Sequence, residues 1–387
     1  MALVTEENTM RTLTSIDTPA AVIDITKMQR NIIRMQSHLD TLGVQFRPHV
    51  KTSKCLRVAQ AQQQAGAHGI TVSTLKEADY FFENGYRNQL YAVGIAPHKL
   101  EHITTLRQKG CDLKIITDSV ASATSIAQYI QKTKQPLEVR IEIDSDGHRS
   151  GIQPEQQDVL LTVAHTLHNS GAIVGGVMTH AGSSYELNTP ETLQKMAEQE
   201  RAACVKAAER IRADHLPCPV VSIGSTPTAL SAQHLEDVTE VRAGVYVFFD
   251  LVMHNVGVCQ MNEIALSVLT TIISHQPEKG WIITDAGWMA MSRDHGTQKQ
   301  DIDYGYGQVC TVDGKPMQGW IMSSANQEHG IISRTDSSHH NIERLFPIGT
   351  RLRILPNHAC ATGAQFPEYQ ALSSDNTLEI WPRIYGW

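Results

Sequence analysis

Short apolar runs alternate with amphipathic helical patterns through the first two thirds of the chain. The expected strands cover residues 20–25, 44–50, 69–74, 89–94, 112–117, 138–144, 173–179, 220–225 and 240–248. The expected helices cover residues 26–42, 53–65, 75–84, 97–108, 119–132, 154–169 and 192–212. Mostly apolar strands that alternate with helices predict a parallel sheet covered by helices. The eight strands from residue 44 onward fit a closed (β/α)₈ barrel of the TIM type. An open doubly wound sheet is the alternative, but no Gly-x-Gly-x-x-Gly turn follows an early strand.

The pattern changes after residue 256. Short strands are expected at residues 265–274, 280–285, 308–312, 320–322, 330–333, 351–355 and 378–381, separated by Gly, Pro, Asn and Asp turns. Such spacing predicts a second, mostly antiparallel β domain. The run at residues 20–25 precedes the first barrel helix and is available to pair in that domain. We therefore expect a barrel domain over residues 27–256 and a β domain made of residues 1–26 and 257–387.

Composition excludes several classes of partner. The 387 residues include 33 Lys and Arg and 40 Asp and Glu. The resulting net charge of −7 argues against a surface that binds nucleic acid or an anionic membrane. The most apolar window, residues 241–258, contains Arg242, Asp250 and His254 and cannot span a bilayer. The N-terminus has no apolar signal-peptide core, and the seven cysteines include no Cys-x-x-Cys pair. We expect a cytoplasmic protein with no nucleic-acid or membrane partner.

Lys51 is the first candidate for chemistry. It follows the expected strand 44–50 and lies beside Arg47 and His49. A lysine held against the apolar wall of a barrel becomes a better nucleophile, because burial disfavours its charged form. Lys51 is therefore a candidate Schiff-base lysine for pyridoxal phosphate (PLP), although a solvated surface lysine is the ordinary alternative.

Other polar residues collect where the expected strands end, which is where a (β/α)₈ barrel builds its active site. Arg149 is suited to a hydrogen bond with the phenolic oxygen of a pyridoxal ring, and His180 or Tyr185 to contact with that ring. The remaining candidates in the set are Ser73, Thr74, Asp144, His148, Gly224, Ser225, Thr226 and Tyr246.

The run Gly224-Ser225-Thr226-Pro227 follows the seventh barrel strand and opens a helix. Glycine, free N–H groups and the helix dipole favour a phosphate at such a place. The same residues also suit an ordinary N-cap followed by proline. Both interpretations stay open.

His358 and Cys360 form the candidate metal site. They follow the expected strand 351–355, and extended backbone would point both side chains to the same face. Imidazole nitrogen and thiolate sulfur suit Zn²⁺. With 18 histidines in the chain, a chance His-x-Cys spacing is the alternative. Two protein ligands would leave positions open for substrate and water, as in a catalytic site.

Several of these motifs occur together in one order. They are Arg47-Pro-His-Val-Lys51-Thr, Asp144-x-Asp-Gly-His-Arg-Ser-Gly151, Thr179-His-Ala-Gly182, Gly224-Ser-Thr-Pro-Thr228 and Pro356-Asn-His-x-Cys360. The set resembles the D-serine dehydratase and D-threonine aldolase group of PLP enzymes, which have the alanine-racemase-type barrel (fold type III). The resemblance extends from about Thr18 to Trp387.

The resemblance implies a PLP enzyme that works as a homodimer. Lys51 would form the Schiff base, Gly224, Ser225 and Thr226 would hold the phosphate, and Arg149 and Tyr185 would lie around the ring. His180 and Tyr246 complete the expected cofactor-binding residues. His358 and Cys360 would bind a divalent metal, for which the thiolate favours Zn²⁺ over Mn²⁺, Co²⁺ or Mg²⁺.

The implied activity is dehydration of a D-configured β-hydroxy amino acid. D-threo-3-hydroxyaspartate would yield oxaloacetate and ammonia, and D-serine would yield pyruvate. Aldolases of the group carry aspartate at the position of Cys360, so the thiolate here favours the dehydratase. Retro-aldol cleavage of D-threonine is the second candidate. A non-catalytic PLP-binding protein is the third, and the roughly 130 residues after Gly257 argue against it by size. Four cations are candidate partners of a substrate β-carboxylate: Arg293, His295, His329 and Arg334.

Overall fold

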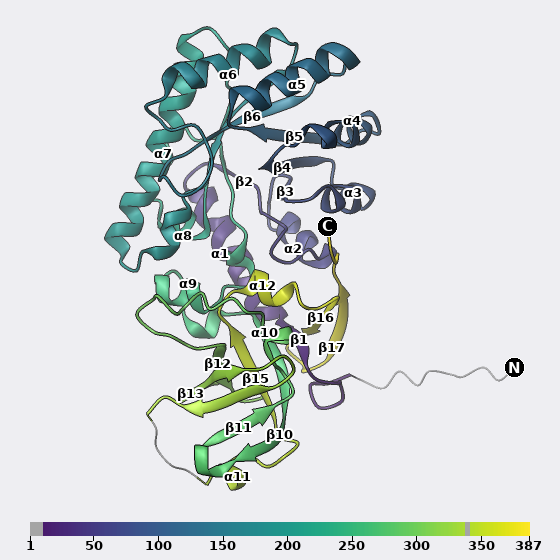
Figure 1. Ribbon diagram of the computed structural model, residues 1–387, viewed down its shortest axis with the longest axis vertical. Helices are drawn as coiled ribbons and strands as arrows, with labels where there is room; N and C mark the ends of the chain where they lie inside the picture. Colours follow the sequence, from purple (N-terminus) through teal and green to yellow (C-terminus); the bar gives the residue numbers. More distant parts are fainter. Residues whose placement is uncertain (1–10, 337–340) are drawn as a thin grey trace, which may run out of the picture. The chain divides into compact units, whose positions relative to one another are not determined.

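The computed structural model describes residues 11–336 and 341–387, which form two compact units (Figure 1). The barrel unit contains Asn31–Tyr246, Val256–Val258 and Ile384–Trp387. The β unit contains the chain up to Arg30, Val247–Asn255 and Cys259–Arg383.

The barrel unit is built on eight parallel strands. The sheet runs in the order β2-β9-β8-β7-β6-β5-β4-β3, and a parallel bridge between His49 and Thr71 joins its two edges. The closed (β/α)₈ architecture expected from the alternating pattern is therefore confirmed. The strands are β2 (Gln45–Phe46), β3 (Ile70–Val72), β4 (Asn88–Gly94), β5 (Asp112–Thr117), β6 (Glu138–Ile143), β7 (Ile173–Thr179), β8 (Val220–Ile223) and β9 (Glu240–Val241).

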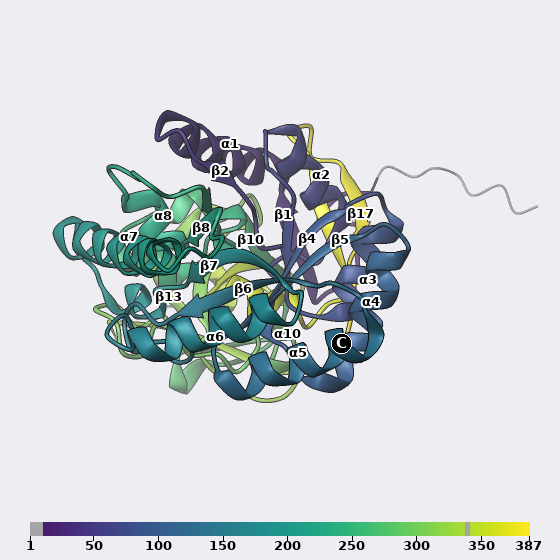
Figure 2. The ribbon, with the colours of Figure 1, turned by 90° about the horizontal axis from the view of Figure 1, so that it is seen from above.

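Helices cover the outer side of these strands (Figure 2). Polar residues start several of them: the side chains of Thr74, Ser119 and Thr189 accept hydrogen bonds from backbone N–H groups of the first helical turn. The helices are α1 (Ile25–Thr41), α2 (Leu56–Gln64), α3 (Leu75–Glu83), α4 (Leu100–Gln108), α5 (Val120–Thr133), α6 (Gln157–Asn169), α7 (Pro190–Ala213) and α8 (Thr226–Ser231), with short 3₁₀ turns at Pro97–Lys99, Gly182–Glu186 and Val245–Val247.

A charged network is buried inside the barrel. Glu240 accepts hydrogen bonds from Arg47 Nε at 2.6 Å, Arg140 Nη1 at 2.7 Å and Ser222 Oγ at 2.7 Å. Arg242 Nη1 donates to Ser222 Oγ at 2.5 Å. Burial alone would raise the pKa of Glu240, but Arg47 and Arg140 outweigh it and hold the pKa far below its usual value. Arg47 and Arg140 contact the Glu240 carboxylate directly, and Arg242 joins through Ser222, so the network holds three arginines and one carboxylate, an excess of positive charge.

Two expected barrel strands contract to two residues each. The expected strand 240–248 is wrong beyond Val241, because a 3₁₀ turn forms at Val245–Val247 and the Tyr246 amide donates to Thr226 Oγ1. The expected strand 44–50 contracts to β2, with His49 adding only a single bridge. Apolar residues in these runs are buried by tertiary packing rather than by sheet pairing.

The β unit contains a nine-stranded sheet in the order β11-β14-β13-β12-β15-β10-β1-β16-β17. A further pairing of β10 with β11 closes six of these strands into a barrel. All its ladders are antiparallel except β1–β16. The strands are β1 (Ala20–Asp24), β10 (Leu266–Gln276), β11 (Trp281–Thr284), β12 (Gly307–Cys310), β13 (Pro316–Ala325), β14 (Gly330–Arg334), β15 (Arg351–Pro356), β16 (Glu368–Leu372) and β17 (Leu378–Pro382).

Apolar residues from alternate strand positions fill the core of this small barrel. Val268, Ile282, Met322, Ile332 and Ile354 are fully buried together. Four short helices connect the strands: α9 (Leu251–Val256), α10 (Trp288–Met291), α11 (Ile342–Leu345) and α12 (Ala359–Gly363), with 3₁₀ turns at Met261–Glu263 and Pro277–Lys279. The sequence patterns did not predict β16 or these four helices. Over the described ranges, no helix combines the length and apolarity that crossing a membrane requires.

Candidate active site

The C-terminal ends of the parallel strands share one rim of the barrel, and Lys51 lies there. It follows the His49 bridge, in the turn formed by residues 50–53. The expectation that Lys51 is buried is wrong for the single chain, because the turn carries it beyond the last paired residue and leaves it exposed. Burial therefore does not account for the reactivity expected of this amine, and its charged surroundings become the relevant feature.

Those surroundings form a cationic cluster, made of Lys51, Arg149 and Arg242 with the two imidazoles of His49 and His180. Burial lowers the pKa of His49 well below its ordinary value, and the positive charges of Lys51 and Arg242 lower it further. Among the described residues, the buried Nδ1 atom of His49 has no hydrogen-bond partner. An anion that accepts hydrogen bonds is the ligand chemistry that fits this cluster.

His180 is held in one orientation at the end of β7. Its Nδ1–H donates to the carbonyl oxygen of Gly224 at 3.0 Å, which leaves Nε2 as the acceptor. Burial lowers the pKa of His180 to about 3, so the ring is neutral near pH 7. The Tyr185 ring lies beside it, with centroids 6.1 Å apart and planes at 49°. The structure thus brings together two rings that the sequence placed in one expected loop.

The turn before α8 is organised by its own hydrogen bonds. Ser225 Oγ accepts from the Thr228 amide at 3.2 Å, while the Ser225 amide donates to Thr228 Oγ1 at 3.0 Å. Buried Glu200 on α7 accepts from the amides of Gly224 at 3.1 Å and Ala181 at 2.9 Å. The N-cap interpretation of this turn is therefore confirmed. The amides of Gly224 and Ser225 are used within the chain, so hydroxyl groups and the Thr226 end of the helix would have to meet a phosphate.

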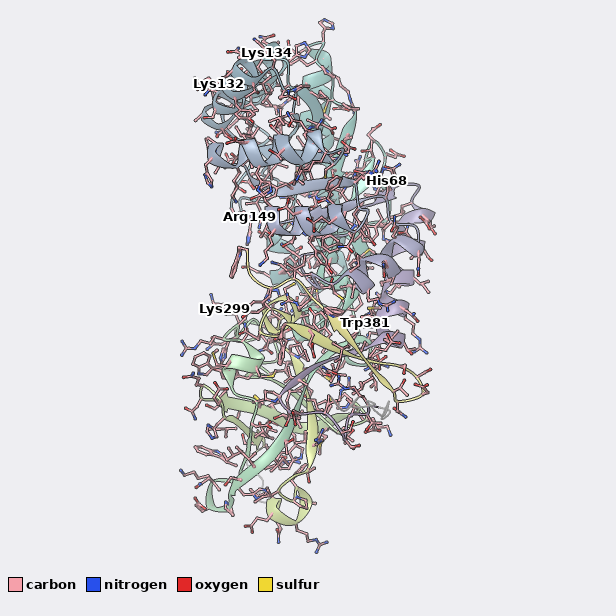
Figure 3. The ribbon with its side chains drawn as sticks, turned by 90° about the vertical axis from the view of Figure 1, so that its right-hand side faces the viewer. His68, Lys132, Lys134, Arg149, Lys299 and Trp381 are labelled. Carbon is pink, nitrogen blue, oxygen red and sulfur yellow. The ribbon has the colours of Figure 1, made fainter. Side chains whose placement is uncertain are left out.

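Two other expected cofactor residues lie in contrasting environments. Tyr246 is fully buried, its hydroxyl accepts from Gln62 Nε2 at 2.8 Å and its ring packs edge-on against Phe46 at 5.2 Å. Its backbone, rather than its ring, borders the α8 turn through the bond to Thr226. Arg149 is exposed on the surface of the barrel unit (Figure 3), in the loop that follows β6.

The cluster as a whole fits PLP chemically. PLP carries a phosphate dianion and a phenolic oxygen, which match the positive excess and the unpartnered His49 Nδ1. Its aromatic ring matches the neighbouring rings of His180 and Tyr185, and its aldehyde requires an accessible primary amine such as that of exposed Lys51.

In the β unit, the side chains of His358 and Cys360 lie together as expected, but their backbone conformation differs from the expected one. His358 is extended and caps α12, while Cys360 lies in the first turn of that helix. The prediction that both residues are extended is therefore wrong. The two side chains nevertheless share a hydrogen bond. Burial disfavours the charged imidazole, but Cys360 and Asp294 outweigh it and raise the pKa of His358 well above its ordinary value.

Three polar contacts hold this short helix in place. His358 Nδ1 donates to Asp294 Oδ2 at 2.6 Å, which directs Nε2 away from the carboxylate. Asp250 Oδ2 accepts from the Ala359 amide at 2.9 Å, and burial raises the pKa of Asp250 to about 6. Asn357 Nδ2 donates to the Gly305 carbonyl at 2.7 Å. A histidine whose second nitrogen bonds a carboxylate is the usual arrangement of a metal-binding imidazole.

His358 and Cys360 provide fewer ligands than a metal ion bound by protein side chains alone requires. Within residues 11–336 and 341–387, no group of three or more His, Cys, Asp and Glu side chains is arranged to hold a metal. One imidazole and one thiolate suit a borderline-soft ion such as Zn²⁺ with open positions, which is the pattern of a catalytic rather than a structural site.

Four residues that organise these sites were not predicted: Glu200, Arg242, Asp250 and Asp294. Arg242 and Asp250 interrupt the most apolar window of the chain, and a charge in such a run was the available signal. Glu200 and Asp294 lie in polar segments, where nothing local distinguishes them from solvated carboxylates.

The chain matches two protein-family models. Residues 23–252 match "Alanine racemase, N-terminal domain", and residues 265–372 match "Putative serine dehydratase domain". The first match covers more than half of the 387 residues.

Curated relatives and a solved structure match nearly the whole chain. The chain is 61% identical over 377 residues to D-threo-3-hydroxyaspartate dehydratase of Delftia sp. (strain HT23), covering 97% of this chain and 99% of that protein. It is 28% identical to D-serine dehydratase of Dictyostelium discoideum, covering 95% and 96% of the two chains. The solved Delftia structure matches with a TM-score of 0.96, covering 97% of this chain and all of that one. Structures of a histidine-to-alanine variant of D-threo-3-hydroxyaspartate dehydratase and of a cysteine-to-alanine variant in the metal-free form both match with a TM-score of 0.97.

Proposed function

Because the chain belongs to the family defined by the alanine racemase N-terminal domain, we propose that it is a PLP- and metal-dependent dehydratase of D-configured β-hydroxy amino acids. The preferred substrate in this proposal is D-threo-3-hydroxyaspartate, with D-serine as a second substrate. The observation that carries the proposal is the 61% identity to the Delftia dehydratase over 97% of this chain. The enzyme is a lyase that works as a cytoplasmic homodimer.

The cofactor residues proposed for the barrel, residues 27–256, are those of the cationic cluster and its neighbours. Lys51 would bind the aldehyde covalently, Arg149 the phenolic oxygen, and Gly224, Ser225 and Thr226 the phosphate. His180, Tyr185 and Tyr246 complete the set. PLP, when bound, supplies an electron sink for the substrate α-carbon.

The β domain, proposed as residues 1–26 and 257–387, would supply the metal through His358 and Cys360. Zn²⁺ is the ion that this donor pair favours, and it would act as a Lewis acid toward a hydroxyl group. The two variants of D-threo-3-hydroxyaspartate dehydratase support this assignment, because the altered histidine and cysteine are separated by one residue, as His358 and Cys360 are. The metal-free form of the cysteine variant supports a metal at such a pair.

Side chains of this protein would then accept and position the protons that move in the reaction. The Lys51 amine takes the proton from the substrate α-carbon as the β-hydroxyl leaves as hydroxide. Neutral His180, fixed by Gly224, presents Nε2 as an acceptor beside the ring of Tyr185. Asp294 holds His358 in the tautomer that frees Nε2. Hydrolysis of the released enamine completes the balance, so D-threo-3-hydroxyaspartate gives oxaloacetate and ammonia, and D-serine gives pyruvate and ammonia.

A substrate panel tests the reaction class. D-serine, D-threonine and both D-3-hydroxyaspartate diastereomers are assayed with and without a chelator. Ammonia with a keto acid, lost on chelation while PLP stays bound, supports the proposal. Glycine with acetaldehyde from D-threonine would identify an aldolase instead, and no turnover of any substrate would refute the dehydratase.

Lys51→Ala tests the cofactor assignment, with Lys54→Ala as a matched control. Lys54 lies three residues away and pairs with Glu77 at 3.1 Å. Only the Lys51 variant should lose both activity and the visible absorbance of lysine-bound pyridoxal. Retention of both by Lys51→Ala would end this assignment.

A further inference from the structure

Arg293 is held against an aromatic ring in the β unit. Its guanidinium carbon lies 4.4 Å from the centroid of the Trp288 ring. Trp288 begins α10, and its amide donates to the Asn326 carbonyl at 2.9 Å, which fixes the start of the helix. Ser292 has a φ of +73°, a strained value for a residue with a side chain, and this bend turns Arg293 back toward Trp288. A stacked guanidinium keeps its N–H donors in the plane of the group, where they can bind a carboxylate in bidentate fashion.

Arg293 is also next to the proposed metal ligands. The following residue, Asp294, accepts the 2.6 Å hydrogen bond from His358. Helix α10 packs on α12, which carries Cys360, and Thr362 Oγ1 donates to the Met291 carbonyl at 2.7 Å (Figure 1). The cation and the metal ligands therefore belong to one packed cluster of short segments within a single unit.

The charge of Arg293 is available for a ligand. Among the described residues, no Asp or Glu lies within ion-pair distance of it. Arg334 stacks on Trp320 at 5.5 Å in the same manner, but it is paired with Asp336. An exposed arginine that is pre-oriented and unpaired matches a small carboxylate better than one that is already neutralised.

The two histidines among the four predicted partners of a substrate β-carboxylate fit this role less well. The His295 ring packs edge-on against Tyr306 at 4.2 Å. His329 is exposed in the hairpin turn between β13 and β14. Arginine stays charged at every pH at which the enzyme works.

We propose that Arg293, stacked on Trp288, binds the β-carboxylate of the substrate and sets the preference for 3-hydroxyaspartate over D-serine. The inference rests on the proposed function and adds to it the residue that recognises the third substituent of the substrate. D-serine lacks this carboxylate, so it serves as an internal control that uses the same metal and cofactor chemistry.

The test compares Arg293→Met with the matched variant Arg334→Met in the holoenzyme. Loss of a charge-assisted bidentate contact should lower kcat/KM for D-threo-3-hydroxyaspartate by about 10- to 100-fold, chiefly through KM. The value for D-serine should stay within about twofold of the wild type. Arg334→Met should leave both substrates unaffected. Arg293→Lys should recover part of the loss in kcat/KM, because lysine restores the positive charge but not the planar, bidentate set of N–H donors.

A binding measurement separates this inference from the proposed function. D-tartrate, a hydroxy dicarboxylate, and D-lactate, a hydroxy monocarboxylate, are titrated calorimetrically into each variant after its PLP and metal contents are measured. Weaker D-tartrate binding by Arg293→Met, with D-lactate binding unchanged, supports the inference even if no substrate is dehydrated. If Arg293→Met loses equal affinity for D-tartrate and D-lactate, or loses affinity for neither, the inference is overturned.

Discussion

Asp294→Asn is expected to weaken the proposed metal binding, although it changes neither of the proposed ligands, His358 and Cys360. The Asp294 carboxylate accepts from His358 Nδ1 at 2.6 Å. That hydrogen bond lowers the pKa of Asp294, so the acceptor is ionised near neutral pH. An asparagine of the same shape removes the negative charge and can present its NH₂ group instead, which would favour the wrong tautomer or rotation of the ring.

The size of the effect follows from the role of the contact. Loss of a carboxylate that orients a metal-binding histidine typically lowers metal affinity by about 10- to 100-fold. At about 1.4 kcal/mol per tenfold change, the expected loss of binding free energy is about 1.4–2.8 kcal/mol. The remaining contacts of α12, from Asp250 and Asn357, should keep the helix folded.

The assay is a competition titration of the metal-free protein with Zn²⁺ and a chromophoric chelator. Asp214→Asn is the control, because Asp214 forms a 2.5 Å contact with His165 on the exposed surface of the barrel unit. The control should bind Zn²⁺ like the wild type, and both variants should retain PLP. Identical Zn²⁺ affinities for wild type and Asp294→Asn, alongside loss of binding in His358→Ala, would refute the positioning role.

Three further changes test the barrel, each followed by urea unfolding of the PLP-free chain. Glu240→Gln should lower the free energy of unfolding by about 3–5 kcal/mol, because it leaves Arg47 and Arg140 buried without their carboxylate. Gly176→Ala should lower it by more than about 1 kcal/mol, since Gly176 has a φ of +135° and an added Cβ would strike the backbone of β8. The pKa of His180 falls from 6.5 to about 3 on folding, so its contribution to stability is complete above 6.5 and is lost as the pH decreases toward 3. That loss amounts to about 1.4 kcal/mol per pH unit and should be smaller in His180→Asn.

Each of these expectations has a clear counter-result. Glu198→Gln, which breaks an exposed pair with Arg201, should change stability by less than about 1 kcal/mol, so a similar value for Glu240→Gln would contradict the buried-network argument. Wild-type stability in Gly176→Ala would mean that β7 can relax away from β8. Equal acid sensitivity of the wild type and His180→Asn would show that other groups dominate the response.

Local patterns predicted the repeating part of the fold well. The strands at residues 112–117 and 173–179 were predicted with their observed bounds, β5 and β7. Strands buried on both faces appear as continuous apolar runs, and the helices between them show a periodic apolar stripe. Both signals lie within a dozen residues, so they can be recognised without knowledge of the partners.

The site was only partly accessible to the same reasoning. Lys51, His180, Tyr185 and the Ser225 turn follow strand ends, and parallel pairing brings strand ends to one rim. The exposure of Lys51 was not predicted, because it depends on where β2 stops pairing.

Only the tertiary structure determined the contacts between segments that are distant in the sequence. Helix α12 forms where an extended segment was expected because Asp250, more than a hundred positions earlier, accepts its first N–H. The stacking of Arg293 on Trp288 depends on the bend at Ser292, and Asp294 reaches His358 across 64 positions. Residue types and their periodicity are local properties that determine which segments become strands and helices. Hydrogen bonds and ion pairs depend on positions to within an ångström, and folding alone brings such distant groups to those positions.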